Sequence, residues 1–170
     1  MKIGNKDRFL YYVAGILLVL AYLLLWFLVN PVGIEELRYV GWIILAVGLV
    51  LIFLPMFVFR TKGKVKKGND WTETSALVDT GIYSVVRHPL YLGLLLMYLA
   101  IILWSQHGLT IIVGIIGMMC VYLISRQEDQ RLIGKFGDDY KSYMHSVPRM
   151  NLLAGIVRLV RQRKGKKNES

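Results

Sequence analysis

The hydrophobic positions of this sequence gather into long, nearly unbroken runs. The first run extends over residues 9–29 and ends at Asn30-Pro31, and the second extends over residues 39–59 with one interruption at Pro55. Each run contains about twenty residues, which as a helix would cross roughly 30 Å of hydrocarbon. The pattern therefore predicts two transmembrane helices near the start of the chain.

Two further apolar runs lie later, at 90–104 and 109–125, separated by the four residues Ser-Gln-His-Gly. The third run is short and would reach only about 22 Å as a helix, so it crosses a thinned part of the bilayer or begins below the membrane surface. The four-residue separation predicts a tight turn, and these two runs therefore form a helical hairpin. In total we predict an all-α integral membrane protein with four transmembrane helices.

The residues after the fourth run, 126–163, predict a helical tail. Apolar and aromatic positions recur there every four residues and share one helix face with Glu128; they are Leu132, Phe136, Tyr140 and Met144. Gly137-Asp138 is expected to end this helix and to cap a second one. Residues 152–163 mix apolar residues with arginines and are too short to span, which is typical of an amphipathic helix at the membrane interface.

Composition and charge agree with a membrane protein. The chain has 170 residues, enough for one domain over 1–170, and is 55% hydrophobic with a net charge of +10. A strongly basic soluble protein would suggest a nucleic-acid partner. Here the basic residues lie beside the apolar runs and no nucleic-acid motif occurs, so we interpret the charge as attraction to anionic lipid and expect no nucleic-acid partner.

Lysine and arginine are also distributed unevenly between the two sides of the predicted bundle. The N-terminal tail, the loop at 60–89 and the region after residue 125 are rich in them, whereas the connections on the other side contain only Arg38. The positive-inside rule therefore predicts that both termini and the long loop are cytoplasmic.

Several common catalytic and cofactor sites have no motif in this sequence. There is no phosphate-binding loop, no glycine-rich dinucleotide fingerprint after a strand, and no serine nucleophile elbow. The three histidines lie far apart and Cys120 is the only cysteine, so we expect no metal site and no internal disulfide.

Polar and aromatic residues cluster just before the third run. Arg87, His88, Tyr83 and Tyr91 place a cation, an imidazole and two phenols where that helix enters the membrane. Pro89 suits the first turn of a helix, and the free N–H groups of that turn favour an anionic ligand group. Taken residue by residue, an ordinary arginine that reaches the headgroups and an aromatic belt are the favoured explanation of this segment.

A pair of carboxylates, Glu128 and Asp129, lies within one turn of the end of the fourth run. Glu128 shares its helix face with apolar residues, so its carboxylate points toward protein or membrane and not freely to water. Such a carboxylate needs an interaction partner. A charged cap that marks the exit from the membrane would explain the same pair.

Taken together, the two segments resemble the isoprenylcysteine carboxyl methyltransferase family, which belongs with the phospholipid methyltransferases in a wider membrane superfamily. The first matching pattern is L-V-x-x-G-x-Y-x-x-x-R-H-P-x-Y-x-G. The second has two acidic residues, then x-x-L-x-x-x-F-G-x-x-Y-x-x-Y-x-x-x-V-P-R. The resemblance covers roughly residues 77–149.

This resemblance implies a pocket for S-adenosylmethionine at the cytoplasmic ends of the last two spans, closed by the helices of 126–163, with S-adenosylhomocysteine as the product. It implies catalytic positions at Glu128, beside the cofactor, and at Arg149, on the acceptor side. The implied cofactor-binding residues are Val78, Gly81, Tyr83, Arg87, His88, Pro89, Tyr91, Gly93, Asp129 and Tyr140. One departure is Asp129, because the family usually has glutamate at that position.

The predicted function is methylation of a lipophilic acceptor, with an isoprenylated cysteine carboxylate as the leading class. Such a transfer needs positioning and exclusion of water but no metal. Methylation of a phospholipid, or of another amine or thiol, stays open. A sterol reductase that uses NADPH is a less favoured hypothesis, since such enzymes have similar C-terminal motifs, and so is a membrane scaffold without enzymatic activity.

Overall fold

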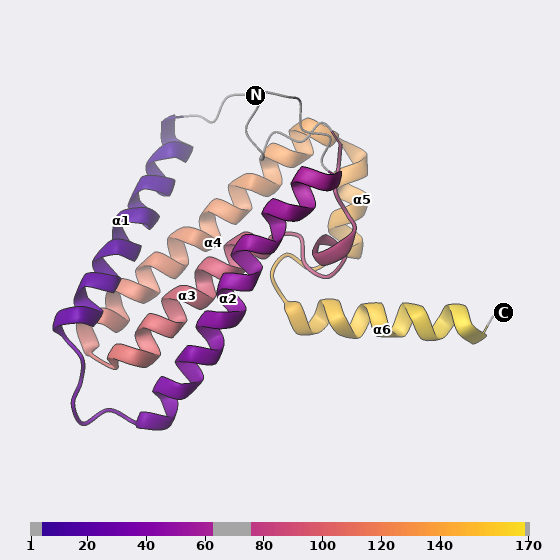
Figure 1. Ribbon diagram of the computed structural model, residues 1–170. Helices are drawn as coiled ribbons and strands as arrows, with labels where there is room; N and C mark the ends of the chain where they lie inside the picture. Colours follow the sequence, from indigo (N-terminus) through magenta and orange to yellow (C-terminus); the bar gives the residue numbers. More distant parts are fainter. Residues whose placement is uncertain (1–4, 63–75, 169–170) are drawn as a thin grey trace. The chain divides into compact units, whose positions relative to one another are not determined.

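The computed structural model describes residues 5–62 and 76–168 (Figure 1). Within these residues all regular structure is helical, which confirms the predicted all-α class for this part of the chain. The elements are α1 (Asn5–Phe27), α2 (Glu35–Lys62), the short 3-10 helix η1 (Gly81–Ser84), α3 (Pro89–Ser105), α4 (Gly108–Phe136), α5 (Asp138–Ser146) and α6 (Leu152–Asn168). Of the predicted loop at 60–89, residues 63–75 lie outside the described residues.

Three of the described helices are long and apolar enough to cross a membrane. They are α1 over Arg8–Phe27, α2 over Glu35–Pro55, and α4. Helix α3 has 17 residues and would reach about 25 Å, so it is the short apolar helix that the sequence predicts. The count of four spans stays a prediction.

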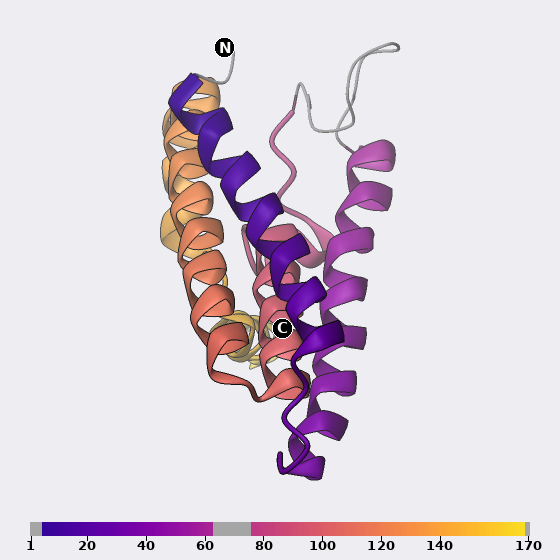
Figure 2. The same ribbon diagram turned by 90° about the vertical axis from the view of Figure 1, so that its left-hand side faces the viewer.

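The first compact unit contains α1, α2 up to Ile52, α3 from Leu90 and α4 up to Arg131. Its apolar core joins α1, α3 and α4 through residues that include Ala14, Tyr98 and Val121. The Tyr98 hydroxyl donates a hydrogen bond of 2.6 Å to the Ala14 carbonyl. In Figure 2 the two helices α1 and α4 are inclined to each other.

Close helix packing in this unit depends on glycines. A side chain at Gly93 of α3 would stand 2.6 Å from the Gly48 carbonyl of α2, and Gly117 of α4 lies against the Tyr98 ring. Helices α3 and α4 thus form the predicted hairpin, and the small residues allow their neighbours to approach closely.

The turn of this hairpin falls at the predicted residues, between Ser105 and Gly108. The Ser105 hydroxyl donates to the Leu28 carbonyl at 2.7 Å. The Gln106 side chain both accepts from the Ile34 N–H and donates to the Ile34 carbonyl, each at 2.7 Å. These bonds hold the connection between α1 and α2 against the hairpin turn.

The second compact unit contains residues 53–89 and 132–170. Helix α4 runs on past residue 125 to Phe136, so one helix carries the fourth apolar run and the start of the predicted tail. Gly137, with φ +60°, ends α4 and precedes α5, at the predicted break. That left-handed conformation is one in which a residue with a side chain would be strained.

Helix α5 packs its aromatic face into a small apolar cluster of the second unit. Tyr140, Tyr143 and Val147 are buried there, with Leu77 and Phe136 packed beside them. Helix α6 follows and continues to Asn168, five residues beyond the predicted end at Arg163.

Candidate functional site

The second unit brings the two sequence motifs together through their backbones. The Arg87 N–H donates to the Pro148 carbonyl at 3.0 Å, and the His88 N–H donates to the Arg149 carbonyl at 3.1 Å. These residues lie about sixty positions apart in the chain. The Arg-His-Pro turn and the Val-Pro-Arg segment are therefore paired side by side.

The Arg87 side chain strengthens the same pairing. It is 8% exposed, and its Nε donates a hydrogen bond of 2.9 Å to the Val147 carbonyl. A buried guanidinium is costly unless its donors find acceptors, so this bond fixes both the arginine and the segment that carries Arg149. Arg87 thus positions the second motif, whether or not it also contacts a cofactor.

Tyrosines support the loop that precedes α3. The Tyr143 hydroxyl donates a 2.6 Å hydrogen bond to the Tyr83 carbonyl, which ties α5 to η1. Burial raises the pKa of the Tyr83 phenol, so this side chain is neutral at physiological pH and offers an uncharged hydroxyl. Tyr140 packs edge-on against Tyr143, with ring centroids 5.8 Å apart.

The remaining predicted residues of this unit have distinct surroundings. Val78, His88 and Pro89 are buried, whereas Gly81 is exposed and has φ +66°. The positive φ explains why glycine opens η1, because other residues rarely adopt that conformation. Arg149 is half-buried.

A separate polar cluster lies in the first unit, on α1, α3 and α4. Arg131 donates to both carboxylate oxygens of Glu128, through its Nε at 3.0 Å and through a second, shorter bond. The charges of Glu128 and Arg131 act on the Tyr91 hydroxyl, which lies 3.0 Å from the Tyr11 hydroxyl. This cluster combines one carboxylate, one guanidinium and two phenols.

Asp129 of α4 is buried among the helices of the first unit. It is 1% exposed and ends a buried stripe along α4 in which every fourth residue is buried. The stripe comprises Gly117, Val121, Ser125 and Asp129. Since residues four apart share a helix face, the stripe that packs within the apolar core also carries the carboxylate.

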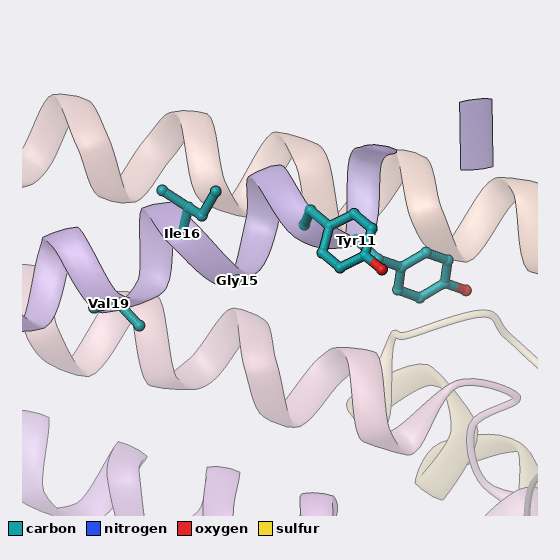
Figure 3. Close-up of a pocket in the computed structure, with 5 residues that line it drawn as sticks. Tyr11, Gly15, Ile16 and Val19 are labelled. Atoms are coloured by element: carbon teal, nitrogen blue, oxygen red, sulfur yellow. The ribbon is translucent and has the colours of Figure 1, made fainter. Parts of the chain in front are cut away.

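A shallow groove of about 370 Å³ runs along α1 in the first unit (Figure 3). It is lined by Tyr11, Tyr12, Gly15, Ile16 and Val19, and no side chain stands over Gly15. None of the predicted site residues lines this groove. Tyr11 connects it to the polar cluster through its hydrogen bond with Tyr91.

In the described part of the chain, no three His, Cys, Asp or Glu residues are grouped so that they could hold a metal ion.

A family model for phospholipid methyltransferases matches residues 37–139, more than half of the chain. The chain belongs to the phospholipid methyltransferase family. This membership confirms the resemblance to the wider membrane superfamily, and it makes the protein an integral membrane methyltransferase. Neither a curated protein nor a solved structure matches the chain.

In this methyltransferase the matched range includes both the Arg-His-Pro turn and the paired carboxylates, and it ends before the Val-Pro-Arg segment. Two residues of the polar cluster were missed by sequence reasoning, Arg131 and Tyr11. Arg131 follows Glu128 by three positions, a spacing that favours ion pairs on a helix and could have indicated the pair. Tyr11 lies in an apolar run, and no local pattern distinguishes it.

Proposed function

We propose that this methyltransferase transfers the methyl group of S-adenosylmethionine to a lipid-soluble acceptor. The observation that carries the proposal is the backbone pairing of Arg87 and His88 with Pro148 and Arg149. It supports the idea that the two motifs act together, because residues so far apart in the chain are held within hydrogen-bonding distance. In this proposal the residues of the Arg-His-Pro turn and the paired carboxylates both contribute to binding the donor.

The reaction requires little chemistry from side chains. The acceptor atom forms a bond to the methyl carbon while the carbon–sulfur bond breaks, and the cationic sulfonium becomes a neutral thioether. The protein must position the two reactants and exclude water. Tyr83 and Tyr91 offer aromatic faces that would stabilise a sulfonium, as they do other cations.

The charged residues take complementary roles in this proposal. Asp129 and Glu128 bind the ribose hydroxyls and the ammonium group of the donor, and the ion pair with Arg131 fixes the orientation of Glu128. His88 contacts the donor beside the turn. Arg149 orients the acceptor and would hold a carboxylate in bidentate fashion.

For the acceptor we propose an isoprenylated cysteine carboxylate or a similar amphiphile, which would approach from the bilayer. The apolar groove on α1 supports a lateral approach, because it lies on the exposed side of α1 and its Tyr11 bonds to Tyr91. A phospholipid amine is the second candidate, and the family match favours it. The two classes differ in pH dependence, because an amine must lose a proton before it attacks and a carboxylate need not.

Donor binding tests the proposal directly. We expect calorimetry in detergent to detect S-adenosylhomocysteine binding, and His88→Ala and Glu128→Gln each to weaken it at least tenfold, since each removes a polar contact worth about 1.4 kcal/mol or more. Gln130→Ala is the matched control, because Gln130 is exposed on the same helix. Binding of NADPH instead, or unchanged binding in both variants, would refute the proposal.

Acceptor identity follows from a second assay. Purified protein is given labelled S-adenosylmethionine with either a prenylated cysteine or a phosphatidylethanolamine, over a range of pH. Transfer to the prenylated cysteine at a rate that does not rise with pH supports carboxylate methylation. Transfer only to the phospholipid, with a rate that rises as its amine deprotonates, overturns that part and leaves the donor site intact.

We also propose that both termini face the cytoplasm, as the lysine and arginine distribution indicates. In sealed vesicles of known orientation, with Cys120→Ala, a cysteine at exposed Asp139 should react with an impermeant maleimide only from the cytoplasmic side. A cysteine at Val32, which is 90% exposed, should react only from the other side. The reverse pattern would contradict this orientation.

A further inference from the structure

Helix α6 packs along one face against the rest of the second unit. A side chain at Gly155 would stand 2.9 Å from the Val85 carbonyl carbon and closer still to its oxygen. Beside it, the Arg158 guanidinium donates to the Ser84 carbonyl. These two contacts fix α6 against the residues that end η1, and Gly155 is buried as a result.

The opposite face of α6 exposes an apolar stripe. Leu153 is 76% exposed, and the other three members of the stripe are each nearly half exposed: Ile156, Val157 and Val160. They follow the i, i+3, i+4, i+7 spacing of a single helix face. At 100° per residue, the centre of this stripe lies roughly 150° around the helix from Gly155. The attached face and the apolar stripe are therefore on nearly opposite sides.

The same helix is strongly basic. Its sequence contains six cationic residues and no acidic residue. They are Arg158, Arg161, Arg163, Lys164, Lys166 and Lys167. A surface that is both apolar and cationic needs a partner that is both apolar and anionic. A second copy of this helix would bring six further cations to the contact, and the charges would repel each other.

We propose that α6 lies in the interface of an anionic lipid leaflet. The apolar stripe enters the boundary of the acyl chains, while the exposed Arg161 and Lys164 lie at the level of the lipid phosphates. The contacts at Ser84 and Val85 then link this surface helix to the residues that precede the Arg-His-Pro turn. This role in membrane contact is independent of which donor or acceptor the protein uses.

The test measures the depth of a spin label on the full-length protein in lipid bilayers, with Cys120→Ala as the background. One label is placed at Val157 in the stripe and a control label at Gln162, which is exposed on the other side of the helix. In bilayers that contain anionic phosphatidylglycerol, we expect the label at 157 to be accessible to oxygen and shielded from an aqueous nickel reagent. The label at 162 should show the opposite behaviour.

The contribution of electrostatic attraction to the insertion of α6 is tested by changing first the lipid and then the protein. Replacing phosphatidylglycerol with neutral lipid should make the label at 157 accessible to the aqueous nickel reagent, and high salt should do the same. The double variant Arg161→Gln and Lys164→Gln should lower the equilibrium constant for insertion roughly 30-fold, about fivefold for each charge. Circular dichroism and thermal unfolding check that the variants fold.

Three results would overturn the proposal. The first is a label at 157 that is as accessible to the nickel reagent as the label at 162, in anionic bilayers. The second is shielding that is equal in neutral and anionic lipid. The third is shielding that disappears when the protein is diluted within the bilayer, because a second copy would then be what covers the stripe.

Discussion

Replacement of Gly117 by alanine should destabilise the first unit through Tyr98. A methyl group at this position would stand 2.6 Å from the Tyr98 hydroxyl oxygen and closer still to two ring carbons. The ring cannot move away easily, because Tyr98 is only 1% exposed and its hydroxyl is bonded to the Ala14 carbonyl. The substitution therefore forces an overpacked contact and disturbs that bond.

The expected cost combines three effects. Overpacking a buried contact costs about 1–3 kcal/mol. Loss of the tyrosine hydrogen bond costs about 0.6–1.5 kcal/mol between helices in a membrane. Alanine recovers up to about 1 kcal/mol through its better helix propensity. The sum predicts a net loss of about 2 kcal/mol in the free energy of unfolding.

Cys120 provides the measurement, because it is buried in the same core and is the only cysteine of the chain. A thiol-reactive fluorophore reports its exposure as detergent-solubilised protein is unfolded by sodium dodecyl sulfate. Gly15→Ala is the control, since no atom of a neighbouring helix lies within 4 Å of the added methyl group. This control should be neutral or slightly stabilising.

A double-mutant cycle isolates the mechanism. In a Tyr98→Ala background the ring is absent, so Gly117→Ala should cost nothing further. The reasoning is refuted if Gly117→Ala is as well tolerated as Gly15→Ala. It is equally refuted if the cost is the same with and without the Tyr98 ring.

Three further predictions concern the turn of the hairpin and the second unit. Tyr143→Phe should lower stability by about 1–2 kcal/mol, because the Tyr83 carbonyl loses its buried donor, and thermal unfolding measures this. Burial raises the pKa of Tyr83 above its ordinary value of 10.0, so the contribution of its neutral phenol to stability should be complete below pH 10 and should decrease as the pH rises above 10. Tyr83→Phe should flatten this decrease when the free energy of unfolding is measured at alkaline pH. Gln106→Ala removes both bonds to Ile34, and hydrogen exchange at the Ile34 amide should accelerate at least fivefold.

Much of the helical architecture could be predicted because its causes are local. Apolar runs identified the helices, the short third run appeared as the 17-residue α3, and Gly137 ended α4 as expected. The continuity of the fourth apolar run with the helix that ends at Phe136 was harder to predict. The change from apolar to charged residues at 126 marks a change of environment, but the charged residues there are good helix formers and do not end the helix.

The candidate site was less accessible to sequence reasoning, because its contacts are long-range. The pairing of Arg87 with Pro148 is made by backbone groups, which carry no side-chain pattern. Two of the predicted cofactor-binding residues have a packing role that by itself explains the residue type at their positions. Gly93 lies against the Gly48 carbonyl, and Tyr140 is buried beside Tyr143. A sequence motif does not distinguish such packing from contact with a ligand, and the cofactor roles of these two residues stay predictions.

The uninterrupted length of α4 has a mechanical consequence. Its 29 residues extend about 43 Å, more than the roughly 30 Å of hydrocarbon, without a break between Gly117 and Asp129. Because the helix is continuous, the rotation that its packing against Tyr98 fixes at Gly117 also fixes the direction in which the Asp129 carboxylate points. Insertion of a single residue between the two positions would advance Asp129 by only about 1.5 Å but turn it by about 100°, out of the buried stripe.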